Sequence, residues 1–284
     1  MKLLNLGCGS RYHDAWTNID FVSSRINVIG HNLLKGIPYP DNSFDVAYHS
    51  HVLEHFSKSD GRNFIKECFR VLRPNGVIRI AVPDLERIAE EYLKNLRLAA
   101  QGDVYAEGNY EWIKLELFDQ AVRNEIGGDM AKYMFRDEIP NEEYIYERIG
   151  EEARSLRRAY FQSRQQSEEL KRIPLKRSRI NQILSNFKKI AHRLKGVLLS
   201  ANLKYPENVQ KQISIGKFRL GGEVHQWMYD RFSLSKLLSE VGFIEIEIKD
   251  AFTSKVPSWN CYELESKNGI IYKPDSLFIE AVKG

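Results

Sequence analysis

The sequence predicts an α/β fold, a mostly parallel sheet with a helical insert after its fifth strand. Between residues 1 and 84, short apolar runs that suit buried strands alternate with amphipathic helical patterns, as in parallel strands joined by crossover helices. From about residue 95 to 220 only helical patterns are clear, and strand patterns return near the C-terminal end. With 284 residues, 43% of them apolar, the chain can form a large core.

The N-terminal elements follow in a regular order. The stretch "FDVAYHSHVLEHF" begins as a strand and turns into a helix start near Val52, and Ser59–Leu72 repeats apolar residues at helical spacing. Pro74–Gly76 predicts a turn. The five strands expected here are Lys2–Leu6, Thr17–Phe21, Ile26–Ile29, Phe44–Tyr48 and Val77–Val82.

The second half contains the insert and the last strands. We expect residues 1–94 and 221–284 to form the core, and residues 95–220 to form an insert that acts as a substrate lid or as an interaction element. Helices are expected over Leu85–Gly102 and Trp112–Val122, in a long stretch after Asn141, and over Phe232–Phe243 with Ser233 as its cap. The last two strands are expected at Ile244–Ala251 and Ser276–Val282.

Charge is unevenly distributed along the chain. Residues 153–195 contain thirteen Lys or Arg and two acids, a net charge of +11, whereas the rest of the chain carries −7. Such a block is either a solvated helical face or an element with a task of its own. Three cysteines fit no disulfide framework, and neither a secretion signal nor an apolar run of membrane-spanning length is visible, so we expect a cytoplasmic protein.

The stretch "LLNLGCGSRYHDAWTNIDF" predicts a nucleoside site. A buried strand leads into a Gly-x-Gly turn at Gly7 and Gly9, and the next strand ends on Asp20, whose carboxylate can accept hydrogen bonds from ribose hydroxyls. A dinucleotide fingerprint would have a third glycine where Tyr12 stands. It would also have about twenty residues between the glycine turn and the acid, whereas Gly7 and Asp20 are thirteen residues apart. No Gly-Lys-Ser/Thr loop follows either. The pattern favours a ligand with adenosine and no phosphates.

Taken together, these motifs resemble the class I S-adenosylmethionine-dependent methyltransferases, which have a Rossmann-like fold. "LNLGCGS" is similar to the family's first motif, "NID" to its acidic second motif, "LLKGIPYPDNSFDVAYHSHVLEHF" to its fourth strand with the preceding loop, and "FRVLRPNGVIRIAVPD" to its fifth strand. "DSLFIEAVK" resembles the final strand. The resemblance covers residues 1–84 and 224–284. More narrowly, "HQWMYDRFSL" and "KPDSLF" resemble methyltransferases of surface-polysaccharide biosynthesis.

The resemblance implies S-adenosylmethionine as cofactor and assigns residues to it. Gly7, Cys8 and Gly9 would line its methionine half, and Asp20 would bind the ribose diol. We add Arg11 as a partner for the methionine carboxylate, with an exposed loop arginine as the alternative.

Further cofactor contacts are expected from the third and fourth strands. Asn32 stands where the family usually has Asp against the adenine amino group, and its amide oxygen can still accept a hydrogen bond. Leu33 would offer its backbone to adenine, while His49 and Ser50, after Tyr48, would lie near the amino acid end of the cofactor.

The histidines in "HSHVLEH" allow two interpretations. The stretch is similar to the His-x-His-x-Asp-His metal motif of hydrolases, but it has one extra residue, and Glu54 replaces the Asp. On a helix His51 and His55 would face the same way, so a metal could bind. We favour the other interpretation, in which His49, His51 and His55 line the cofactor pocket and no metal is bound.

Catalytic candidates are His225, His55 and His51. We prefer His225, which follows a glycine pair and would act as a general base or as a helix cap. Asp119 and Arg123, four residues apart in the insert, predict a surface ion pair or part of a substrate wall.

The leading functional hypothesis is O-methylation of a sugar or glycan-linked acceptor. Methylation of RNA or another polyanion is the first alternative, although few aromatic residues interleave the basic block. A non-catalytic assembly partner is the second. Apolar and basic residues alternate at helical spacing over Phe187–Leu198, a pattern that suits weak contact with an anionic membrane, hence a peripheral location at its inner surface, or packing in the insert or in a homodimer.

Overall fold

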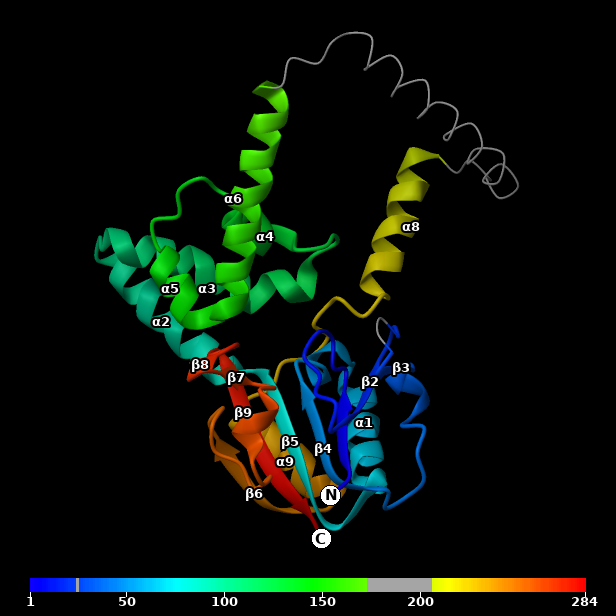
Figure 1. Cartoon of the computed structure of the whole chain (residues 1–284). Coiled ribbons are helices and arrows are strands. Elements are labelled where there is room, and N and C mark those ends of the chain that lie inside the picture. Colours follow the sequence, from blue (N-terminus) through cyan, green and yellow to red (C-terminus); the bar gives the residue numbers. More distant parts are fainter. Residues whose placement is uncertain (24–25, 173–205) are drawn as a thin grey trace, which may run out of the picture. The chain divides into compact units, whose positions relative to one another are not determined.

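The computed structural model describes residues 1–23, 26–172 and 206–284 (Figure 1). Contacts divide the chain into two compact units, residues 1–155 with 218–284, and residues 156–217. The amphipathic stripe expected over Phe187–Leu198 lies outside the described residues. Within the described part, no helix is long and apolar enough to cross a membrane.

The larger unit contains a seven-stranded sheet with the order β3-β2-β1-β4-β5-β9-β6. Neighbours from β3 to β5 pair in parallel, and only β9 runs antiparallel to both its neighbours, so the predicted mostly parallel α/β fold is confirmed. The strands are β1 (Leu3–Leu6), β2 (Thr17–Asp20), β3 (Val28–Gly30), β4 (Phe44–Ser50), β5 (Leu72–Pro83), β6 (Phe243–Lys249) and β9 (Ser276–Lys283).

The turn expected at Pro74–Gly76, before the fifth strand, is instead a break in the regular pairing of β5 with β4. Leu72 pairs with Phe44 and Val77 with Val46, so the residues between them form a bulge against β4. Asn75 takes the left-handed conformation there, with φ of 64°. The strand is therefore longer than predicted, but its regular part still begins at Val77.

Two helices cover one face of the sheet, α1 (Lys58–Val71) and α9 (Arg231–Val241). Their apolar stripes pack on a core that includes Leu4, Ile80 and Leu234. Asp230 is the N-cap of α9, and Oγ of Ser233, at the third helical position, accepts a hydrogen bond from the Asp230 N–H. The expectation that Ser233 is the cap is wrong, because the aspartate three residues earlier completes a capping box.

A loop covers the opposite face of the sheet, where the segment between β1 and β2 is too short to hold a helix. This loop (residues 250–275) joins β6 to β9 and contains a 3₁₀ turn, η3 (Trp259–Tyr262), and the small strands β7 (Ser266–Lys267) and β8 (Ile270–Ile271). Its Trp259 packs edge-on against Trp16 and Tyr48, with ring centroids 6.2 and 5.2 Å apart.

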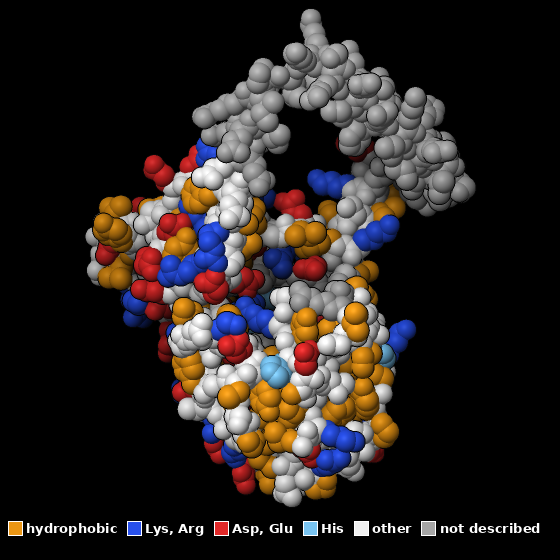
Figure 2. Space-filling view, viewed as in Figure 1, with side chains coloured by type: hydrophobic (Ala, Val, Ile, Leu, Met, Phe, Trp, Pro, Cys, Tyr) orange, Lys and Arg blue, Asp and Glu red, His pale blue; other side chains and the backbone are white. Residues whose placement is uncertain are grey.

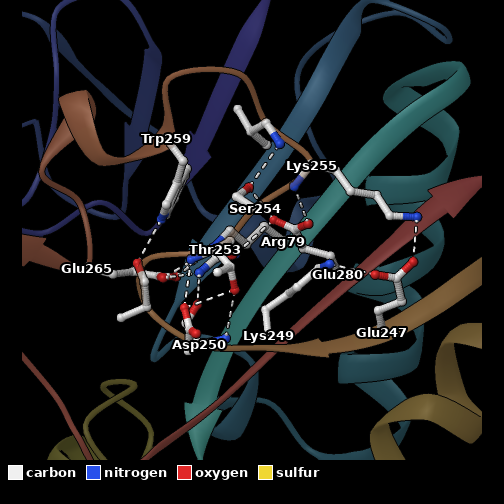
Figure 3. Close-up of polar contacts among 12 residues, drawn as sticks. Arg79, Glu247, Lys249, Asp250, Thr253, Ser254, Lys255, Trp259, Glu265 and Glu280 are labelled. Carbon is white, nitrogen blue, oxygen red and sulfur yellow. Dashed lines mark hydrogen bonds and ion pairs between the residues drawn. The ribbon is translucent and has the colours of Figure 1, made fainter.

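A buried charge network fixes this loop to the sheet (Figure 3). Arg79, on β5, has no exposed surface; it binds the Glu265 carboxylate and donates to Glu280 Oε1 at 2.8 Å. Its remaining N–H groups reach the carbonyls of Thr253 and Asp250 at 2.9 and 2.7 Å. One guanidinium thus joins two strands to the beginning and the middle of the loop.

The helices after β5 form a core of their own. They are α2 (Leu85–Ala100), α3 (Val104–Val122), α4 (Gly128–Met134) and α5 (Glu142–Ile149), followed by α6 (Glu151–Arg172), and α8 (Glu207–Arg219) precedes the return to the sheet. Trp112, Tyr133 and Ile145 centre the packing of α3 to α5. The long helix expected after Asn141 is two helices, because Gly150 has φ of 71° and ends α5. Figure 2 shows charged side chains of both signs over α2–α5. The division of the chain at residues 94 and 221 stays a prediction.

Candidate active site

The carboxyl ends of β1, β2 and β4 meet at one edge of the sheet. Leu6 pairs with Ile19 on one side and with His49 on the other, so the glycine turn lies between the ends of both neighbouring strands. Gly7 has φ of 65°, and a Cβ there would lie 2.3 Å from Val52 Cγ2, so this position requires glycine. Ligands of parallel sheets bind at this edge.

The turn is held against β2 and leaves Gly9 open. The N–H groups of Gly7 and Cys8 donate to Ile19 O at 2.8 and 3.1 Å, and the Gly9 N–H donates to Asp20 Oδ2 at 2.6 Å. A Cβ on Gly9 would meet no atom within 4 Å, which leaves space for a ligand against the backbone. Burial and the charge of Asp20 raise the pKa of the Cys8 thiol to about 11, so it stays neutral.

Asn32 and Leu33 lie in the loop after β3. Asn32 is the N-cap of a 3₁₀ turn, η1 (Leu33–Lys35), and its Oδ1 accepts from the Leu34 N–H at 3.0 Å. That bond fixes the backbone of Leu33 and leaves the amide NH₂ and the second lone pair of Oδ1 for a ligand. Open space at Gly9 and the free lone pairs of Asp20 and Asn32 fit an adenosine; the individual contacts stay predictions.

Arg11 is stacked rather than free. Its guanidinium lies 4.0 Å from the ring centroid of Tyr272, on the loop between β6 and β9. The two residues line a cavity of about 320 Å³ together with Ser10, Tyr12, His13, Cys261, Tyr262 and Glu263. Its pairing with a methionine carboxylate stays a prediction.

His49 lies in the core. Its ring is fully buried, 5.0 Å from the ring of Phe64 on α1, and neither ring nitrogen has a partner among the described residues. Burial lowers the pKa of His49 to about 3, so the ring is neutral. A cofactor could reach its backbone but not its side chain, whereas Ser50, at the end of β4, is partly exposed.

The other histidines surround a buried glutamate. His51 has φ of 54° and begins the turn into η2 (Leu53–His55). Its Nδ1 lies 3.2 Å from Glu54 Oε1 and its Nε2 lies 2.8 Å from Ser276 Oγ, at the start of β9. The ring of His51 therefore lies between a carboxylate and a hydroxyl.

His225 reaches the same glutamate from the segment before α9. Its Nε2 is 4.0 Å from Glu54 Oε1, and its ring centroid is 4.9 Å from that of His55. The carbonyl of Glu54 accepts from the N–H groups of Gln226 and Trp227 at 2.7 and 3.2 Å, which fixes the two segments together. The alternative role of His225 as a helix cap is wrong, because Asp230 caps α9.

Burial and charge act in opposite directions on this cluster. Burial raises the pKa of Glu54, but the hydrogen bond and positive charge of His51 and the charges of His225 and His55 outweigh it and lower the pKa to about 2. Burial lowers the pKa of His225 to about 3. The cluster is a buried ionised carboxylate with imidazoles around it.

Sequence reasoning missed part of this site. The sequence marks Glu54 only as a replacement inside a metal motif, and it predicts no role for Ser276 or Glu152. Glu152 pairs with Lys273 at 3.1 Å; burial raises its pKa, but the charges of Lys273, His51 and Arg11 lower it overall. The "KPDSLF" motif contains Ser276 and is the one sequence feature that points to this part of the site. Glu54, Glu152 and Ser276 lie too far apart in the chain to form a local pattern.

Asp119 and Arg123 have separate roles. The buried carboxylate of Asp119 accepts from the N–H of Asp129 at 2.8 Å, at the start of α4. Arg123 donates to the carbonyl of Glu223 at 2.7 Å. The surface ion pair expected between them is wrong, because each side chain binds backbone instead.

Comparison with known proteins identifies a methyltransferase domain in the N-terminal part of the chain. Residues 4–80 match the methyltransferase domain family. A protein of Mycolicibacterium smegmatis named "Probable S-adenosylmethionine-dependent methyltransferase" is 45% identical over 56 residues, 20% of this chain and 21% of that protein. A Mycobacterium tuberculosis protein of the same description is 38% identical over 60 residues, 21% of each chain. The chain thus matches about a fifth of the length of these relatives.

Solved structures resemble the chain only weakly. A SAM-dependent methyltransferase from Archaeoglobus fulgidus aligns over 99% of this chain and 86% of its own, with 12% identity and a TM-score of 0.37. One from Mesorhizobium loti aligns over 29% and 47%, with 17% identity and a TM-score of 0.23. The assignment depends instead on the sheet order, the glycine turn and the match over residues 4–80. On these grounds residues 4–80 are a methyltransferase domain, and the sheet has the strand order of the Rossmann-like fold expected for class I S-adenosylmethionine-dependent methyltransferases.

Proposed function

We propose that the chain transfers the methyl group of S-adenosylmethionine to a hydroxyl group of a sugar or a glycan-linked acceptor. The observation that carries this proposal is the oriented pair of His51 and Glu54, next to the end of β4. Methyl transfer from a sulfonium is an in-line displacement, so the protein has to align the acceptor and exclude water. A hydroxyl acceptor also loses a proton, which requires a base beside it.

His51 has the geometry of that base. In a neutral imidazole one nitrogen donates and the other accepts. Nδ1 faces Glu54 Oε1 at 3.2 Å and therefore carries the proton, which leaves Nε2 as the acceptor. Ser276 Oγ, 2.8 Å from Nε2, stands where an acceptor hydroxyl would donate. Glu54 would then stabilise the imidazolium that forms, as the carboxylate of a catalytic triad does.

The exposed surface of the side chains favours His51 over His225 as the proton acceptor, whereas the sequence favoured His225. The His51 side chain keeps 12% of its surface exposed, against 6% for His225. Burial makes His225 a weak base, since it lowers the pKa of this residue to about 3. We therefore place His51 first as proton acceptor, and His225 and His55 beside it.

The cavity beside the glycine turn supports a sugar acceptor. It combines the rings of Tyr262 and Tyr272 with the guanidinium of Arg11, and aromatic surface next to a few polar groups suits a polyhydroxylated ring.

The test is methyl transfer with labelled S-adenosylmethionine. Acceptors would be nucleotide sugars, free oligosaccharides and lipid-linked glycans, with tRNA and a protein hydrolysate as comparison classes. We expect label in a glycan fraction, released as a methyl ether after acid hydrolysis. Label confined to RNA or peptide would overturn the acceptor class, and no cofactor binding in calorimetry would overturn methyl transfer itself.

A further inference from the structure

We propose that Glu54, His55 and His225 form a binding site for a divalent transition-metal ion, such as Zn²⁺. Each residue offers one ligand atom, and these atoms lie within 4.8 Å of one another. The site differs from the metal motif considered for "HSHVLEH": His49 is excluded by its place in the core, and His225 joins from 170 residues further along the chain.

Unpartnered buried atoms point to a cation. The side chain of Glu54 has no exposed surface; Nδ1 of His51 lies 3.2 Å from its Oε1, while Oε2 has no hydrogen-bond partner among the described residues. Nδ1 of His55 is buried and unpartnered as well. A buried carboxylate with so few hydrogen bonds is strongly unfavourable unless a positive charge lies against it. An ion bound between these atoms would satisfy both groups.

The donor set matches divalent transition metals. Two imidazole nitrogens and one carboxylate oxygen, with further positions open, are a ligand set of catalytic zinc and of other first-row ions. Ligand atoms about 2.1 Å from one tetrahedral ion are about 3.4 Å apart, so a closure of roughly 1.4 Å from the separation of 4.8 Å completes the site.

Backbone hydrogen bonds hold the ligands in place. Besides the two bonds to the Glu54 carbonyl, Gln226 Nε2 donates to the carbonyl of His55 at 2.9 Å, and the His225 N–H donates to Gln120 O at 3.0 Å. Nδ1 of His51 lies against the carboxylate of Glu54 and orients it from outside the ligand set. The two ligand-bearing segments are thus fixed to each other before any ion binds.

A consequence for catalysis rests on the proposed function. An ion at this position would lie next to His51 and could hold the oxygen of the acceptor. Coordination would make a bound hydroxyl more acidic and would so help His51 to take its proton. Metal binding itself does not depend on this reaction.

The test begins with the full chain treated with a chelator and dialysed. ZnSO₄ and CoCl₂ are titrated by calorimetry, bound metal is measured by elemental analysis, and bound Co²⁺ is followed by its visible absorption. We expect about one ion per chain. His55→Ala and Glu54→Gln should weaken binding at least tenfold, whereas the matched control His31→Gln, a histidine outside the cluster, should bind as the unaltered chain does.

A second measurement separates a lost site from a lost fold. Each variant is tested for S-adenosylhomocysteine binding, which should be unchanged, since no ligand of the metal lies in the glycine turn. Absence of bound metal in the unaltered chain, or equal affinity in His55→Ala, would overturn the site. Metal binding without glycan methylation would confirm the site and overturn the proposed function instead.

Discussion

Arg79 and Glu265 form a buried ion pair although 186 residues separate them in the chain. The pair joins the middle of β5 to the loop that covers one face of the sheet, and Glu280 on β9 completes it (Figure 3). Trp259 lies over the same guanidinium, 4.4 Å from its carbon, so charge and aromatic packing hold the loop together.

Replacing the guanidinium should destabilise the protein strongly. Arg79→Met leaves two carboxylates buried without a counter-charge, and breaking a buried pair in this way costs about 3–5 kcal/mol. Urea denaturation followed by tryptophan fluorescence measures the loss. The matched control is Glu247→Gln, which breaks the exposed contact with Lys249 in the same region and should leave the denaturation midpoint unchanged. Equal midpoints for both variants would contradict the role given to Arg79.

Stability should fall as pH rises through the weakly acidic range. Burial and the charge of Glu280 raise the pKa of Glu265 from its usual 4.5 to about 7, although Arg79 acts against them. Between these values the folded chain holds a proton that the unfolded chain has lost, so the free energy of unfolding falls with rising pH. The slope is at most about 1.4 kcal/mol per pH unit.

The variant Glu265→Gln checks this dependence. It cannot titrate, so its denaturation midpoints between pH 4.5 and 7 should vary less than those of the unaltered chain. An unchanged slope in this variant would assign the dependence to other groups.

The glycine turn and this network show which features a sequence reveals. Gly7, Gly9 and Asp20 lie within fourteen consecutive residues, so strand, turn and acid could be recognised together. Arg79 stands in an apolar run, "VIRIAV", and nothing near it identifies Glu265 as its partner. The fold followed from local periodicity, whereas the loop that replaces a missing helix depends on distant contacts.

Contacts between residues far apart in the chain also explain why the histidine cluster could be predicted only in part. His51, Glu54 and His55 are neighbours in the sequence, but His225 joins them from the segment before α9, and Ser276 joins them through the pairing of β9 with β5. The family resemblance also implied that His49 and His51 would both line the cofactor pocket. In the structure β4 turns His49 into the core, and the left-handed backbone at His51 redirects the chain.

Asp20→Ala should lose cofactor affinity. Two ribose hydrogen bonds to a charged group would be removed, each contributing roughly 1.5–3 kcal/mol, so the Kd should rise at least tenfold. Calorimetry with S-adenosylhomocysteine measures it, and NAD should not bind either form. Asp14→Ala is the control, because this exposed carboxylate contacts Asn27 on the surface. An unchanged Kd in Asp20→Ala would refute the ribose assignment.

Replacing Gly7 or Gly9 by alanine should affect stability and cofactor affinity in different ways. Gly7→Ala brings its Cβ to 2.3 Å from Val52 Cγ2, so it should lower both thermal stability and cofactor affinity. Gly9→Ala meets no atom within 4 Å, so its cost to the fold is the left-handed strain of roughly 1–2 kcal/mol, while the methyl group fills the space expected for the cofactor. Thermal denaturation and calorimetry on both variants separate these effects. Cofactor binding retained by Gly9→Ala would show that the ligand does not approach this glycine.

His51→Ala should lower turnover by roughly a hundredfold or more while the Kd for the cofactor stays constant, because a general base acts on the acceptor and not on cofactor binding. Ser276→Ala keeps the pair of His51 and Glu54 and removes only the hydroxyl beside Nε2, so its loss should be much smaller. Single-turnover rates measure both losses, and calorimetry with S-adenosylhomocysteine checks that the Kd for the cofactor is unchanged. Equal losses of rate in His51→Ala and Ser276→Ala would transfer the base role to another group.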